Sequence, residues 1–164
     1  MKTFLIWKNR ILTGTYTIYS NGRIIGRIKN NYISQSADGE LNGVKYTFKT
    51  RGLFKQHTQI LDNQTNTMIG EILYNNWMTK ATLSIQNKKA FWKYENMLNT
   101  KWSIFNSEGM RINYSGSPTS GRIESNAEDD LLLLSGLYIT SYYRQLTIAI
   151  LIVAFVPIWT TLLI

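Results

Sequence analysis

The chain has 164 residues, carries a formal net charge of +8 and contains no cysteine. This length suits one domain with its own core better than two. The absence of cysteine excludes disulfides, thiolate metal sites and a cysteine nucleophile. The basic residues are spread along the chain, so no charged tail predicts disorder. The apolar stretch FLIW near the N-terminus is too short for the core of a signal peptide and favours a first strand.

Short segments of alternating apolar and polar residues run from Thr3 to Ser125. In one of them Val44, Tyr46 and Phe48 alternate with polar residues, which gives a strand one apolar face and one wet face. Asn-Gly and similar turn sequences separate the segments. The predicted strands are 3–8, 13–20, 23–29, 31–36, 43–50, 56–62, 67–73, 79–86, 89–96, 100–106, 109–115 and 121–125. About twelve antiparallel strands indicate a closed barrel or a sandwich, and a barrel of that width needs a plug.

The pattern changes to a helical one at Ser125. Ser125 and Glu128 have the spacing of a capping box, and acidic residues follow in the first turn. Leu131 to Tyr143 is apolar nearly all round, as in a helix that is buried on every side. After Arg144, the segment from Leu146 to Ile164 has no charge and is long enough to cross a hydrocarbon core.

Two interpretations of this apolar third are open. In the first, the part before Arg144 is the barrel plug and the part after it is a separate membrane anchor. In the second, both belong to one buried core helix, but about fifty ångströms of helix would be longer than a barrel of such short strands. The first interpretation is therefore favoured.

Three segments carry a family resemblance: ILDNQTNTMIGEI (60–72), KATLSIQN (80–87) and KWSIFNSEGMRINY (101–114). Together with the apolar helix they resemble the tubby-like superfamily, which includes the tubby C-terminal domain, the LURP-one-related proteins and the phospholipid scramblases. The resemblance implies a mainly β fold, a twelve-stranded barrel over 1–143 around a central helix at about 126–143. Residues 145–164 go beyond that pattern and are expected to form a C-terminal transmembrane anchor. No scramblase calcium-binding segment is visible, and the phosphoinositide-binding residues of tubby have no clear counterparts here.

The anchor also predicts a location. Pro157 would be costly inside a soluble helix but is tolerated in membrane spans, and Trp159 suits an interfacial position. Every Lys and Arg precedes Leu146. The positive-inside tendency then predicts a single-pass protein with the barrel in the cytoplasm.

Candidate catalytic and metal-binding residues are scarce. His57 is the single histidine and is expected on a solvent-facing strand surface, without carboxylates at ligand spacing. The acids fall mostly in turns or at the start of the helix, where capping explains them. Trp7, Trp77, Trp92 and Trp102 are expected in the barrel wall or core. The sequence therefore predicts neither an enzyme nor a metal site or cofactor.

Basic residues give the one candidate binding surface. Arg23, Arg27 and Lys29 recur at even spacing and are expected on one strand face, and Lys45 and Lys49 form a second outward pair. These five are the candidate lipid-binding residues, because anionic headgroups attract such clusters. An ordinary solvated exterior is the competing interpretation. Nucleic acid is not an expected partner of a chain with a membrane segment.

The sequence thus predicts a membrane-proximal binding or scaffolding module, tail-anchored and non-catalytic. Its expected partners are membrane lipids and a protein of a membrane complex. The alternatives are a scramblase-like lipid transporter subunit, suggested by the resemblance alone, and an accessory subunit of a membrane complex.

Overall fold

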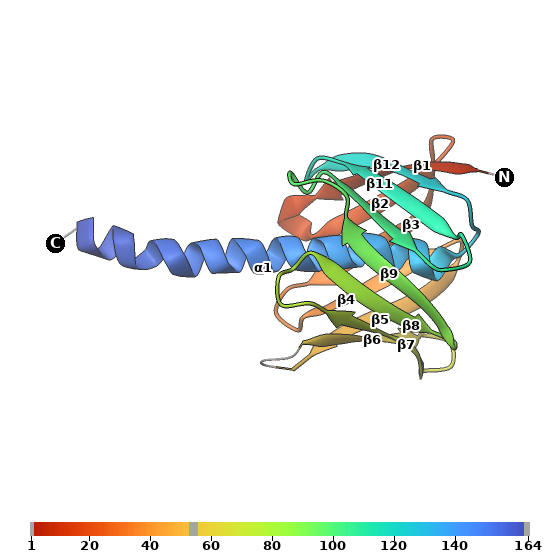
Figure 1. The fold of residues 1–164 in the computed structure, drawn as a ribbon, viewed down its shortest axis with the longest axis horizontal. Coiled ribbons are helices and arrows are strands. Elements are labelled where there is room, and N and C mark those ends of the chain that lie inside the picture. The colour runs from red at the N-terminus through yellow and green to blue at the C-terminus, as the bar shows by residue number, and fades with distance from the viewer. Residues whose placement is uncertain (1, 53–55, 163–164) are drawn as a thin grey trace.

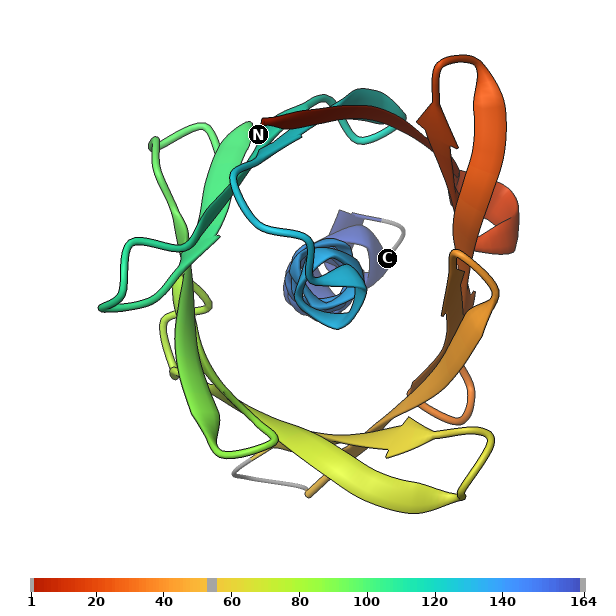
Figure 2. The same ribbon diagram turned by 90° about the vertical axis from the view of Figure 1, so that its right-hand side faces the viewer.

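The computed structural model describes residues 2–52 and 56–162, except for the side chains of 160–162. Twelve antiparallel strands form a closed barrel, in which each strand pairs with its neighbours in sequence and β12 pairs with β1. Figure 2 looks along the barrel and shows α1 in its centre. The mainly β fold around an apolar C-terminal helix confirms the predicted fold class.

The elements follow one another with short connections. In chain order they are β1 (Thr3–Arg10), the 3-10 helix η1 (Ile11–Thr13), β2 (Thr15–Ser20), β3 (Arg23–Asn31), β4 (Ser36–Leu41), β5 (Val44–Arg51), β6 (His57–Asp62), β7 (Thr67–Tyr74), β8 (Lys80–Ile85), β9 (Lys88–Tyr94), β10 (Lys101–Phe105), β11 (Arg111–Gly116), β12 (Ser120–Ser125) and α1 (Asp130–Leu162).

The predicted strand at 31–36 is wrong. Residues 32–35 form a turn, in which the side chain of Asn31 accepts hydrogen bonds from the backbone N–H groups of Ile33 and Ser34. The strand itself, β4, comes later, and it directs Ala37, Gly39 and Leu41 inward. Two of its three inward positions are small residues, so its apolar alternation is weak in the sequence.

Helix α1 is one unbroken helix, whereas the sequence predicted a plug and a separate anchor divided near Arg144. Its start also differs from the prediction. The side chain of Asp129 accepts a hydrogen bond from the N–H of Leu132 at 2.9 Å, so Asp129 is the N-cap. Ser125, the predicted cap, instead bonds to the backbone of Ala127.

The first part of α1 fills the barrel. Every residue from Leu131 to Tyr143 is buried, including Ser135 and Thr140, whose hydroxyls donate to backbone carbonyls one turn earlier in α1. The inner wall facing this helix contains the fully buried rings of Trp92, Trp102 and others. Leu131–Tyr143 is therefore the plug that a barrel of this width requires.

Because all strand pairs are antiparallel, the turns alternate between the two ends of the barrel. We call the end from which α1 projects the exit end; Figure 1 shows α1 leaving the barrel there, away from the N-terminus. The described exit-end loops are 11–14, 32–35, 75–79, 95–100 and 117–119. The loops of the opposite end are 21–22, 42–43, 63–66, 86–87, 106–110 and the connection 126–129 into α1.

Candidate membrane-facing end of the barrel

The second part of α1 leaves the barrel. Burial stops after Tyr143, and each described side chain from Thr147 to Trp159 is exposed. These exposed residues are almost all apolar, and no charge follows Arg144 in the helix. Within the described residues, α1 is the one helix that is long and apolar enough to cross a membrane. A solvated helix with no polar face is unfavourable in water, so this half needs an apolar environment.

Hydrogen bonds from the barrel wall hold the helix in place just before it leaves. The Tyr138 hydroxyl bonds to Thr50 Oγ1 at 2.7 Å, and Thr50 bonds to Thr58 at 2.7 Å. Thr58 in turn bonds to the hydroxyl of Tyr74 at 2.6 Å. Burial raises the pKa of Tyr74 well above its usual value, so its hydroxyl stays neutral in this network. The hydroxyl of Tyr143 donates to the backbone carbonyl of Lys80.

Arg144 lies at the exit end as the last charged residue of the helix. Its guanidinium carbon lies 5.4 Å from the centre of the Trp102 ring, a cation–π distance. Burial raises the pKa of the neighbouring Tyr94 to about 12, and the positive charge of Arg144 acts in the opposite direction. Arg144 therefore marks the boundary between the plugged barrel and the uncharged half of α1.

A pocket of about 460 Å³ lies where α1 emerges, between the helix and the loops that follow β1 and β3. Ile11 and Tyr32 line it from the loops, and Leu146, Ile148 and Ile152 line it from the helix. The side-chain amides of Asn30, Asn31, Gln35 and Gln145 also line it. These two exit-end loops thus lie beside the beginning of the uncharged half of α1.

The predicted basic face is only partly assembled. The pairing of β2 with β3 shifts between Ile18 and Tyr19 and skips Ile25, so β3 contains a bulge. A bulge reverses the alternation of side chains along a strand. Arg27 and Lys29 project outward together, but Arg23 belongs to the other face, at the opposite end of the barrel, and its predicted place beside them is wrong.

Carboxylates lie between the remaining basic residues. In the register of the sheet, Glu40 on β4 lies between Arg27 and Lys45, and Asp38 lies beside Lys29. Lys49 lies opposite Ser36. The sequence analysis missed this alternation because it placed the fourth strand at 31–36 and left Asp38 and Glu40 in a turn, whereas both acids lie on β4.

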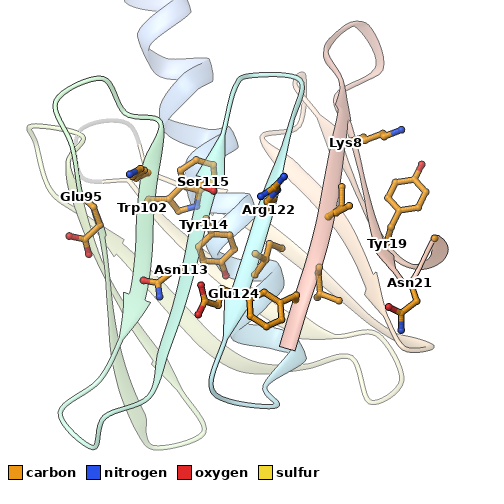
Figure 3. Close-up of a pocket in the computed structure, with 16 residues that line it drawn as sticks. Lys8, Tyr19, Asn21, Glu95, Trp102, Asn113, Tyr114, Ser115, Arg122 and Glu124 are labelled. Carbon is orange, nitrogen blue, oxygen red and sulfur yellow. The ribbon is translucent and has the colours of Figure 1, made fainter. Parts of the chain in front are cut away.

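A larger hollow of about 1010 Å³ lies on the outer wall over β1, β11 and β12 (Figure 3). Its labelled side chains include Glu95, Asn113, Arg122 and Glu124, which come from different strands and the loop after β9. Burial acts to raise the pKa of Glu95, but a hydrogen bond from Ser103 and the nearby charges outweigh it, so the pKa is lowered. The carboxylate of Glu95 lies 2.6 Å from the guanidinium of Arg111, so it is occupied in an ion pair on the barrel wall.

The remaining predicted residues are His57 and the tryptophans. His57 is partly exposed, with Nε2 3.9 Å from a carboxylate oxygen of Glu71. Among residues 2–52 and 56–162, no three His, Asp or Glu side chains are grouped so that they could hold a metal ion. Trp7, Trp92 and Trp102 are buried as predicted. The prediction for Trp77 is wrong, because this side chain is 84% exposed in an exit-end loop.

Comparison with protein-family models, curated proteins and solved structures gives no match to this chain. The resemblance to the tubby-like superfamily therefore stays a prediction that rests on the three segments and the strand order.

Proposed function

We propose that this chain is a single-span membrane protein whose barrel is a rigid, non-catalytic binding module held beside the bilayer. The observation that carries the proposal is the unbroken course of α1. The same helix is enclosed by the barrel over Leu131–Tyr143 and is exposed and apolar after Arg144. No flexible linker separates the two parts, so the barrel and the span would move as one body.

The dimensions of the exposed half support a span. At about 1.5 Å per residue, the uncharged helical segment 145–162 is about 27 Å long, close to the thickness of a hydrocarbon core. Since all 18 Lys and Arg residues precede Leu146, the positive-inside tendency favours a cytoplasmic barrel.

Membrane lipids and a protein of the same membrane are the proposed partners. Among the predicted lipid-binding residues, Lys29 and Lys49 lie nearest the exit end on their strands; Asp38 lies beside Lys29, so Lys49 is the best placed for headgroups. Arg27 and Lys45 share a row with Glu40, which weakens their pull on anions, and Arg23 is remote. The alternative of lipid transport gains no support, because α1 and its buried neighbours fill the barrel interior.

Labelling of single cysteines tests the proposed topology. The chain contains no native cysteine, so Gln64→Cys, in an exposed turn of the opposite end, provides one unique site. A membrane-impermeant maleimide should label it in inside-out vesicles but not in sealed right-side-out vesicles. Labelling in right-side-out vesicles would contradict a cytoplasmic barrel.

A further inference from the structure

The most exposed large apolar side chains of the barrel gather at one end. Leu12, Ile33, Trp77, Met97 and Leu98 are between 81% and 100% exposed. All five belong to exit-end loops. In the loops of the opposite end, Asn and Gly predominate, and the one large apolar residue, Met110, is partly buried against the core. Exposed apolar side chains that gather at one end mark an interaction surface.

These loops surround the emerging helix. They connect β1 to β2, β3 to β4, β7 to β8 and β9 to β10. In the closed strand order the first and third of these connections lie across the ring from each other, as do the second and fourth. Figure 2 shows α1 in the middle of this ring. A flat surface perpendicular to α1 would therefore meet apolar side chains on opposite sides of the helix.

Two of these loops lie beside the uncharged part of α1. The pocket at the exit end brings Ile11 and Tyr32, next to Leu12 and Ile33, beside Ile148 and Ile152. When this uncharged part of α1 lies in a bilayer, the loops beside it must enter the same leaflet.

The charged residues also differ between the two ends of the barrel. The described charged residues in the exit-end loops and at the strand ends beside them are Arg10, Arg51, Lys80, Lys101 and Glu95. Glu95 is already paired with Arg111 and Lys93. By the same criterion, the opposite end carries the basic residues Arg23, Lys88 and Arg111 together with the carboxylates of Asp62, Glu108, Glu128, Asp129 and Asp130, so acids outnumber basic residues there. Basic residues at the strand ends, next to exposed apolar residues in the loops, suit contact with a membrane surface that has anionic headgroups.

We propose that Leu12, Ile33, Trp77, Met97 and Leu98 form a membrane-contacting rim that inserts into the leaflet where α1 begins its span. The inference rests on the proposed membrane span and adds a second point of attachment to it. A bilayer is the occupant that fits, because one flat apolar layer reaches all four loops while α1 passes through it. The rim seats the barrel end-on and leaves the opposite end and the outer-wall hollow facing the aqueous side.

Depth measurements with single cysteines test the rim. Ile33→Cys, Trp77→Cys and Met97→Cys are each labelled with an environment-sensitive NBD fluorophore in the full chain. Gln64→Cys at the opposite end and Ile152→Cys in the exposed half of α1 are the matched controls. Each protein is reconstituted in vesicles of phosphatidylcholine and phosphatidylglycerol, with or without lipids that are spin-labelled near the top of the acyl chain. These substitutions replace exposed side chains, so the fold should be unchanged.

We expect the three rim probes to be blue-shifted and quenched by the spin-labelled lipid, as the Ile152→Cys probe is, while the Gln64→Cys probe is unaffected. If the Ile152→Cys probe is quenched but the rim probes behave like the Gln64→Cys probe, the proposed membrane contact of the rim is wrong, while the proposed membrane span of α1 is supported. Rim probes that are blue-shifted but not quenched would indicate a protein partner on this surface and would also overturn the rim. If the Ile152→Cys probe itself is not quenched, the proposed span fails, and the rim fails with it.

Discussion

At Gly136, α1 has no side chain, and the ring of Tyr114 on β11 occupies the space. A Cβ atom at this position would lie 2.3 Å from the Tyr114 hydroxyl oxygen and 2.4 Å from the adjacent ring carbon. The same hydroxyl donates a hydrogen bond to the carbonyl of Leu133 at 2.9 Å. The glycine is therefore required for close contact between the plug and the wall, although glycine lowers helix propensity.

We expect Gly136→Ala to destabilise the barrel. In an exposed helix this change would stabilise by roughly 1 kcal/mol, but overpacking against Tyr114 should cost about 1–3 kcal/mol. Denaturant unfolding of the full chain in detergent, followed by tryptophan fluorescence, measures the difference. An unchanged or higher free energy of unfolding would show that Tyr114 does not pack on Gly136.

At the scale of the element, α1 is one helix in two environments. The sequence of α1 does not distinguish them by amphipathicity, because it is apolar all round in both parts. What separates them is the barrel, which encloses the first part and ends near Tyr143. The same substitution should therefore have different effects in the two parts.

We expect Leu134→Asp to unfold the barrel and Ile152→Asp to leave it folded. Leu134 is fully buried, and an unpaired carboxylate there should cost several kcal/mol, a large share of the about 5–15 kcal/mol that stabilises a typical domain. Ile152 lies outside the barrel, so a carboxylate there should weaken only membrane retention. Circular dichroism and limited proteolysis in detergent compare the two variants. Equal stability of Leu134→Asp and the native chain would contradict the role of Leu131–Tyr143 as a plug that stabilises the barrel.

Most elements could be predicted from the sequence because each inward strand face is marked by large apolar residues, as in Val44 to Phe48. β4 was misplaced because two of its inward positions are Ala37 and Gly39. The continuity of α1 could not be predicted, because Arg144 marks a change of environment along α1 without interrupting the helix, and its side chain packs on Trp102.

The candidate site was less predictable than the fold. The bulge at Ile25 and the acids of β4 depend on how strands pair, which is not a property of any single strand. The exposed rim was missed for a similar reason. An apolar residue in a turn, such as Trp77, looks the same in the sequence whether it folds back onto the barrel or projects from it.

At the scale of the whole molecule, the barrel has a polarity along the axis of α1. Exposed apolar loop residues and an excess of basic over acidic residues are found where the helix leaves, whereas amide side chains and an excess of acidic residues are found at the other end. If water surrounded the whole barrel, exposed apolar loop residues would not be favoured at one end over the other. The shared direction of the helix, the loops and the charge is what a membrane on one side would require.

The most direct test of the central claim, that α1 is both plug and membrane span, is alkaline extraction of cell membranes. The full chain should stay in the membrane pellet at high pH, while a chain truncated after Tyr143 should be found in the supernatant as a folded barrel. Release of the full chain by alkali would contradict the account, since the exposed half of α1 would then be covered by protein and not by lipid.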